Sequence, residues 1–335
     1  MQVFIAGATG VLGTRLVDEL ADRGHDVIGL VRDEVGAAAV EELGGEPRYG
    51  DLLEPETIHA AVAPDGATED GPDVVVHGAT AIPTDVRTTD ADWETTDRLR
   101  REGTRTLLDA AESAGANRFC YQSVCWVARQ PDGSAFDEDS KPHPSRTEQA
   151  ALDGEFIARE RCAAADIDCC ILRGGLFYGH DAAHTRLYAK ELLDGFLPII
   201  GTGLLGRGDA VLSHCHVDNV ATAFADVAEA DATGTWHVVD DEPATWAAFV
   251  SALAERLGRD PPWRIPAWLA RVAVGNHGVR LLTNDMPTSN EKLKREVGWE
   301  PPVSDYREGL DQAVERWKDE GAIVEIDGGY EWRGE

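Results

Sequence analysis

The fold of this chain is decided by seven residues near its beginning, Gly7-Ala8-Thr9-Gly10-Val11-Leu12-Gly13. A short apolar run, Val3–Ala6, precedes them and is typical of a buried strand. Residues 14–21 follow with apolar positions at helical spacing, and Val27–Val31 predicts a second strand. In such a βαβ unit the glycines let the backbone approach a pyrophosphate at the helix N-terminus. A lone glycine triplet also suits a turn that binds nothing, but the flanking strands and helix favour a dinucleotide site.

The composition indicates a folded and strongly acidic protein. Among 335 residues, 61 are Asp or Glu and 31 are Lys or Arg, so the formal net charge is -30, while 43% of residues are hydrophobic. The length suits one two-lobed unit or two domains. The acids are spread along the whole chain, which favours a solvated acidic coat over an acidic tail. Such a coat argues against nucleic acid and anionic membrane as partners and suggests a high-salt cytoplasm.

The cysteines favour reduced core thiols. They form no C-x-x-C pair, and several lie inside apolar runs where cysteine behaves as a small hydrophobe. His214-Cys215-His216 resembles part of a metal site, but no further ligand cluster stands nearby in the sequence, so we expect no metal. We also expect a cytoplasmic protein without signal peptide or membrane span, because the chain starts with a core strand and contains no long apolar run.

Strands and helices alternate as far as residue 175, which predicts an α/β fold with a doubly wound parallel sheet. A long helix is expected over 93–114 and another over 147–164. After residue 175 the pattern becomes irregular and rich in short helices and Gly/Pro turns. We therefore expect a Rossmann domain formed by 1–175 plus about 213–240. The remainder, 176–212 plus 241–335, is expected to form a smaller, mostly helical substrate lobe.

The second strand is followed by Arg32, at a position where dinucleotide folds often carry an acid for the adenosine ribose. An arginine there can accept a 2′-phosphate, which favours NADP(H). The neighbouring Asp33 could instead bond the ribose, so NAD(H) is the alternative. Asp51 is a candidate acceptor for the adenine amino group, an N-cap for the helix Pro55–Val62, or both. The full set expected to bind the cofactor is Gly7, Thr9, Gly10, Val11, Leu12, Gly13, Arg32, Asp51, Leu52, Gly78, Ala79, Thr80 and Gly175.

Several motifs in the same order together resemble the extended short-chain dehydrogenase/reductase superfamily, of the NAD-dependent epimerase/dehydratase type. The resemblance covers nearly the whole chain. It implies a nicotinamide cofactor, a small-molecule substrate and a homodimer built through the helices 93–114 and 147–164. Besides the glycine stretch, the motifs that carry it are Gly50–Leu52, Gly103–Ala111, Arg118–Phe119, Leu172–Gly175 with Tyr178–Gly179, His216–Ala221 and Lys292–Trp299.

The catalytic motif of that superfamily is missing from this sequence. Its members use a tyrosine, a lysine four residues later, and a hydroxyl at a strand end, which together move a proton. None of the six tyrosines here has a lysine four residues on. Counting back from Glu155, which matches a family acid, the tyrosine position falls on Thr147 and the lysine position on Ala151. The strand-end position falls on Val124, with Ser123 just before it.

Two interpretations remain open. In the first, the protein is an atypical oxidoreductase or epimerase/dehydratase-like enzyme whose proton comes from Ser123, Cys125, Thr147, His180 or water. In the second, it is a non-catalytic NADP(H)-binding sensor or assembly protein. Arg100, in the helix before that strand, replaces an asparagine that members of the superfamily usually carry. The candidate catalytic residues are Ser123 and Thr147, and the candidate substrate residues are Thr84, Cys125, His180, Arg186 and Arg207, with surface ion pairs as the alternative for the last two.

Overall fold

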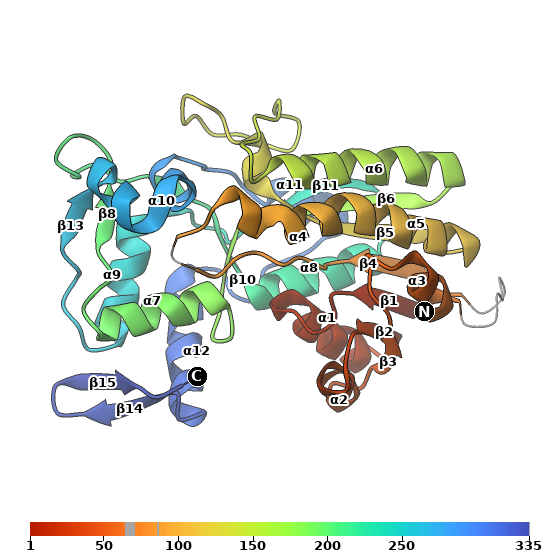
Figure 1. The fold of residues 1–335 in the computed structure, drawn as a ribbon, viewed down its shortest axis with the longest axis horizontal. Helices are drawn as coiled ribbons and strands as arrows, with labels where there is room; N and C mark the ends of the chain where they lie inside the picture. The colour runs from red at the N-terminus through yellow and green to blue at the C-terminus, as the bar shows by residue number, and fades with distance from the viewer. Residues whose placement is uncertain (64–70, 86, 335) are drawn as a thin grey trace.

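A parallel sheet lies at the centre of the molecule (Figure 1). The computed structural model of the chain describes residues 1–63, 71–85 and 87–334; the expected lobe residue Glu335 lies outside them. The described residues form a seven-stranded sheet in the order β11-β6-β5-β4-β1-β2-β3, with every neighbouring pair parallel. The predicted α/β class with a doubly wound parallel sheet is confirmed. The strands are β1 (Gln2–Ala6), β2 (Asp26–Val31), β3 (Glu46–Tyr49), β4 (Val74–His77), β5 (Arg118–Val124), β6 (Asp168–Gly174) and β11 (Gly234–Val238).

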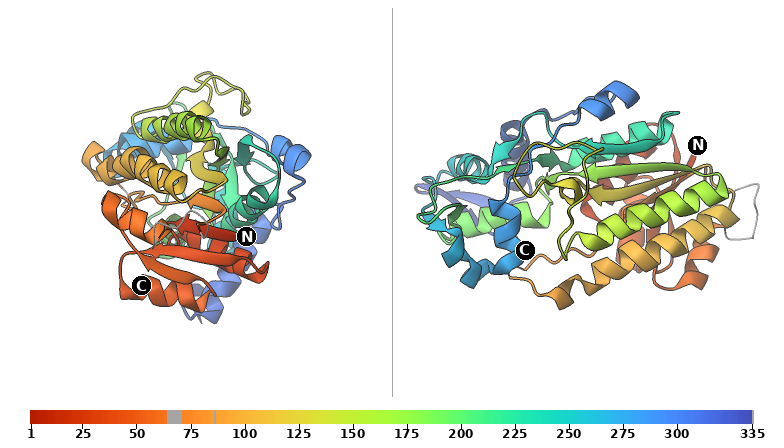
Figure 2. Two further views of the ribbon diagram at one scale, coloured as in Figure 1. Left: turned by 90° about the vertical axis from the view of Figure 1, so that its right-hand side faces the viewer. Right: turned by 90° about the horizontal axis from the view of Figure 1, so that it is seen from above.

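Helices cover both faces of the sheet, because each strand sends apolar side chains to both sides. One face packs against α1 (Val11–Asp22), α2 (Glu34–Glu42) and α8 (Val217–Glu229). The other packs against α3 (Pro55–Val62), α5 (Thr104–Ser113) and α6 (Gln149–Ala165). Helices α5 and α6 lie side by side along the sheet (Figure 2). The parallel arrangement brings the loops after β1, β2, β4, β5 and β6 to one edge, where ligands bind in such folds.

The long helix expected over 93–114 is interrupted. A 3₁₀ turn (Asp90–Trp93) and α4 (Glu94–Arg98) lead into a π-helical turn at Leu99–Gly103, and α5 follows. The carbonyl oxygen of Leu99 lies 3.2 Å from Nε2 of His77 on β4, which draws it away from the regular helical hydrogen bonds. The Thr104 hydroxyl donates to the carbonyl of Arg100 at 2.6 Å and holds the widened turn.

The region after β6 contains a separate hydrophobic core, in which Trp317, Phe249 and Leu310 are buried. Helix α11 (Glu291–Val297), by contrast, packs back on the sheet, where Lys292 Nζ donates to the Thr235 carbonyl at 3.0 Å. The other elements of the region are β7 (Leu176–Tyr178), α7 (Ala183–Leu193), β8 (Ile199–Gly201), β9 (Val211–Leu212), β10 (His214–His216), β12 (Ala244–Thr245), α9 (Trp246–Arg256), β13 (Arg264–Pro266), α10 (Ala267–Thr283), α12 (Tyr306–Asp319), β14 (Ile323–Ile326) and β15 (Gly329–Trp332).

Two features of this region differ from the sequence expectation. Helix α10 is longer than the short helices expected for this region: it runs to Thr283, with a kink at Gly275, whose φ of 72° a residue with a side chain rarely adopts. The chain ends in the hairpin β14–β15, which the sequence analysis did not predict. No helix in the described ranges combines the length and apolar character that crossing a membrane requires.

Candidate active site

A cavity of about 1140 Å³ lies between the carboxyl edge of the sheet and the elements α7, α9 and α10. It begins at the glycine loop after β1 and extends to α10. Every residue expected to bind the cofactor lies along its wall: Gly7, Thr9, Gly10, Val11, Leu12, Gly13, Arg32, Asp51, Leu52, Gly78, Ala79, Thr80 and Gly175. The sequence motifs, which are far apart in the chain, are thus brought together in one cavity.

The glycine loop is packed so tightly that side chains are excluded at two of its positions. Gly7 has a φ of 98°, and a Cβ there would lie 2.7 Å from the backbone nitrogen of Ala79. A Cβ on Gly13 would lie 2.0 Å from the carbonyl oxygen of Gly7. Gly10 differs, because its φ is -81° and a Cβ would have only the Gly7 oxygen, at 3.4 Å, within reach. The loop therefore forms an open cradle at the N-terminus of α1 that fits a pyrophosphate.

The adenosine end of the cavity lies at the end of β2. Arg32 is exposed there, and the next residue, Asp33, caps α2 by accepting a hydrogen bond from the Gly36 nitrogen at 2.8 Å. Asp51 also faces the cavity and accepts from the Leu53 nitrogen at 2.8 Å. The N-cap of α3 is Glu54, so the interpretation of Asp51 as that N-cap is wrong.

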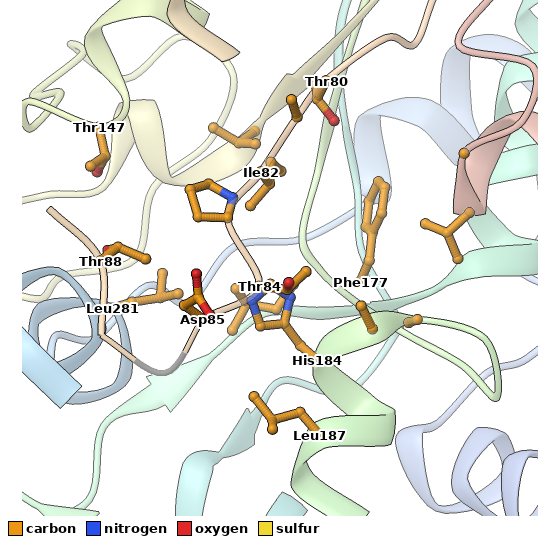
Figure 3. Close-up of a pocket in the computed structure, with 18 of the residues that line it drawn as sticks. Thr80, Ile82, Thr84, Asp85, Thr88, Thr147, Phe177, His184, Leu187 and Leu281 are labelled. Atoms are coloured by element: carbon orange, nitrogen blue, oxygen red, sulfur yellow. The ribbon is translucent and has the colours of Figure 1, made fainter. Parts of the chain in front are cut away.

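The far end of the cavity is mostly apolar. The segment Thr80–Asp85 runs across it, with His184 and Leu187 of α7 on one side and Leu281 of α10 on another (Figure 3). Thr84, one of the expected substrate residues, lies on this segment. Aromatic side chains dominate the wall and include Trp93, Trp126, Phe177, Tyr188, Phe196, Trp246, Phe249 and Trp263.

Ser123 does not reach the cavity. Neighbouring strand residues face opposite sides, so Gln122 and Val124 line the cavity while Ser123 points away and is fully buried. Its hydroxyl donates to Glu155 Oε1 at 2.6 Å. The expectation that Ser123 faces the substrate is therefore corrected by the direction of its side chain.

Glu155 anchors a buried charge network behind β5. Arg173 donates to both of its oxygens at 2.8 Å, and Arg159 donates at 3.0 Å. Burial raises the pKa of Glu155, but the hydrogen bonds from Arg173 and Ser123 outweigh it, and the pKa is lowered overall. Glu155 is therefore ionised, and the Ser123 hydroxyl is committed to it as a structural donor.

Four of the expected substrate residues lie away from the cavity wall. Cys125 is fully buried in a 3₁₀ turn (Cys125–Ala128), and burial raises its pKa to about 12. His180 contacts Arg15 at 3.2 Å. Arg186 lies 4.0 Å from Glu320 and over the ring of Trp332. Arg207 is exposed in the loop between β8 and β9. Partners distant in the sequence hold His180 and Arg186, so their local patterns gave no sign of these contacts.

Thr147 lines the cavity just before α6, and its hydroxyl lies 3.2 Å from that of Ser145 (Figure 3). Ala151, one turn further on, is fully buried. Of the two candidate catalytic residues, the structure therefore brings only Thr147 to the cavity.

The sequence analysis missed three buried polar residues of the cavity wall. Arg100, Gln122 and Glu148 all line it, and each is less than 10% exposed. Alternation along β5 could have indicated Gln122 once Val124 was placed at the strand end. The depth of Arg100 depends on the π-helical turn, for which the sequence carries no clear signal.

His214 belongs to the aromatic end of the cavity. Its ring stacks on Phe249 with centroids 4.4 Å apart and planes 4° apart. Burial lowers its pKa to about 3, so the ring is neutral. No group of three or more His, Cys, Asp or Glu side chains in the described residues is arranged to hold a metal ion.

The parallel sheet, the glycine cradle and the cavity beside it define a dinucleotide-binding protein of the Rossmann class. Residues 3–239 match the family model described as the NAD dependent epimerase/dehydratase family. The chain belongs to this family.

Curated relatives cover nearly the whole chain. It is 34% identical to a 3-diazoavenalumate denitrifying reductase from Streptomyces sp. over 92% of this chain and 99% of the relative. It is 27% identical to a 4-hydroxy-2-methyl-3-oxo-4-farnesyl-3,4-dihydroquinoline-1-oxide ketoreductase from Stigmatella aurantiaca, over 93% of this chain and 95% of the relative. UDP-glucose 4-epimerase from Thermus thermophilus, solved in complex with NAD, has the same fold. Its TM-score is 0.76 at 24% identity, with 95% of this chain and 99% of that chain covered.

Proposed function

We propose that this protein is an NADP(H)-dependent reductase that acts on a small, flat, largely apolar molecule without the tyrosine–lysine pair of its superfamily. The observation that carries the proposal is the identity of the residues at the tyrosine and lysine positions. Thr147 supplies a hydroxyl at the cavity wall in place of the tyrosine phenol. The buried Ala151 supplies no amino group in place of the lysine.

The preference for NADP(H) is supported by the side chains at the end of β2. The carboxylate of Asp33 is engaged in capping α2, while Arg32 is exposed at the cavity. Among the described residues, no ion pair engages the Arg32 guanidinium, so it is available for a 2′-phosphate. When bound, the cofactor supplies a hydride at the substrate end of the cavity.

The missing acid pair restricts the kind of acceptor. Reducing an ordinary ketone creates an alkoxide that must be protonated, and a threonine hydroxyl is a far weaker acid than a tyrosine phenol of pKa about 10. An aromatic diazonium group is electron-poor and carries a positive charge. When its terminal nitrogen accepts a hydride, that charge is cancelled and the product is a neutral diazene, which loses N₂ while its hydrogen moves to the ring carbon. This acceptor needs no strong protein acid, and the relative named as a denitrifying reductase acts on a diazo compound.

The apolar wall favours an aromatic substrate over a nucleotide sugar. A nucleotide diphosphate carries at least two negative charges, whereas the charged side chains at the far end of the cavity, Asp85, Glu191 and Arg280, have no excess of positive charge to match them. The ring faces of Trp126, Phe177 and Trp246 suit a flat apolar molecule. The protein's role is therefore to bind and orient the acceptor and to exclude water from it.

The test is to follow NADPH absorbance with an ortho-diazo phenol, with aromatic ketones and with UDP-glucose as acceptors. We expect turnover with the diazo compound and at least 100-fold slower turnover with the ketones. Thr147→Tyr is the matched variant, and we expect it to lower diazo reduction by filling the cavity.

Two results would contradict the proposal. Faster turnover of UDP-glucose or of the ketones than of the diazo compound would refute the substrate class. Tight NADPH binding without oxidation by any acceptor would favour the non-catalytic sensor. A homodimer through α5 and α6 stays a prediction, to be checked by light scattering.

A further inference from the structure

Arg100 is a buried cation at the cavity wall with no partner for its side chain. It lies in the π-helical turn and is 3% exposed. Its Nε has no hydrogen-bond partner, and within the described ranges no hydrogen bond or ion pair engages its guanidinium. Gln122 on β5 is 8% exposed and also lines the cavity, with its amide oxygen unpartnered. Two buried polar groups from different elements of the cavity wall are thus left without hydrogen-bond partners.

The carboxylates near Arg100 are already engaged by other arginines. Asp97 lies 2.6 Å from Arg146 and 3.6 Å from Arg101, and Glu148 lies 3.9 Å from Arg129. The third, Glu155, is held by the two arginines described above. Among the described residues, the buried arginines in this part of the molecule are Arg100, Arg129 and Arg173, and each of the three buried carboxylates is paired with an arginine other than Arg100.

The chain has about twice as many acidic as basic residues, yet none of the acidic residues in the described ranges is paired with Arg100. Burying an unpaired charge is unfavourable unless another charge compensates it. A ligand anion that enters the cavity would supply the missing partner.

We infer that Arg100 binds a carboxylate of the substrate, so that the natural substrate is an aromatic or conjugated carboxylic acid. This inference rests on the proposed function and narrows its substrate class. The proposed sites for the cofactor phosphates are the glycine loop after β1 and Arg32 after β2, whereas Arg100 lies in the π-helical turn that packs against α6. The planar guanidinium matches a carboxylate, with which it forms charge-assisted hydrogen bonds.

The test measures binding rather than turnover. trans-Cinnamate and its neutral amide, cinnamamide, have nearly the same shape, and both are titrated calorimetrically into the full-length protein with and without NADP⁺. We expect the wild-type protein to bind cinnamate at least tenfold more tightly than cinnamamide. In Arg100→Met this ratio should fall to within about twofold. Arg105→Met, an exposed arginine on the adjoining α5, should keep the wild-type ratio.

Each outcome decides the inference. A wild-type protein without preference for cinnamate, or an Arg100→Met variant that keeps the preference, would overturn it. Melting temperatures of all variants are measured, and Arg100→Gln replaces Arg100→Met if the latter does not fold. NADPH binding is titrated separately by fluorescence. Its absence would refute the proposed function, while the cofactor-free titrations would still test Arg100.

Discussion

Replacing Gly10 by valine should abolish cofactor binding without damaging the fold, whereas Gly13→Ala should destabilise the fold itself. At Gly10 the backbone is extended and a Cβ meets only one atom, at 3.4 Å, so the free energy of unfolding should change by less than about 0.5 kcal/mol. The valine methyl groups would occupy the space of the pyrophosphate. Hydrogen bonds to charged groups are worth about 1.5–3 kcal/mol each, so losing two of them weakens binding at least about 100-fold.

At Gly13 the added methyl would lie 2.0 Å from the Gly7 carbonyl oxygen, far inside any normal contact. The loop has to move, and overpacking of this kind costs about 1–3 kcal/mol or more. The melting temperature should therefore fall by several degrees, at about 2–4 °C for each kcal/mol. The assays are NADPH fluorescence titration and thermal denaturation of both variants. If Gly10→Val binds NADPH within tenfold of wild type, or if Gly13→Ala melts normally, the geometry assigned to this loop is refuted.

Three further results are expected. Ser123→Ala should slow turnover less than tenfold but lower the melting temperature, because the hydroxyl supports Glu155; a larger kinetic loss would give Ser123 a role in the reaction. Burial raises the pKa of Asp240 to about 7, so the native state keeps this proton while the unfolded chain loses it near pH 4. Between pH 5 and 8 the wild type should therefore lose about 2–3 kcal/mol of unfolding free energy relative to Asp240→Asn; denaturant titrations with parallel pH profiles would contradict this. The net charge of -30 predicts that the melting temperature rises from 0.1 M to 2 M KCl, and a flat response would count against an adaptation to salt.

Sequence patterns predicted which residues come together at the glycine-loop end of the cavity. The glycine loop, the short apolar strands and the alternation with helices specify a parallel sheet, and a parallel sheet brings successive loops to one edge. For that reason Gly7, Arg32, Asp51, Gly78 and Gly175 share one cavity, although they are spread over half of the chain.

The substrate half was predicted less well, for two physical reasons. The direction of a strand side chain changes with each residue, so a one-residue decision separated the buried Ser123 from the cavity-facing Val124. The charged candidates are held by distant partners: Arg186 lies near Glu320, and His180 contacts Arg15. Such long-range pairs leave no local periodicity to detect.

The π-helical turn at Leu99–Gly103 makes the cavity sensitive to chain length as well as to residue type. A π turn contains one residue more than an α turn, so α4 and α5 are out of phase by about 100° of helical rotation. Deleting one residue of this turn would restore a continuous helix and rotate Arg100 relative to the sheet. The sheet and the glycine loop would remain intact. A single-codon deletion could therefore change which ligand the cavity accepts in one evolutionary step, without any substitution in its wall.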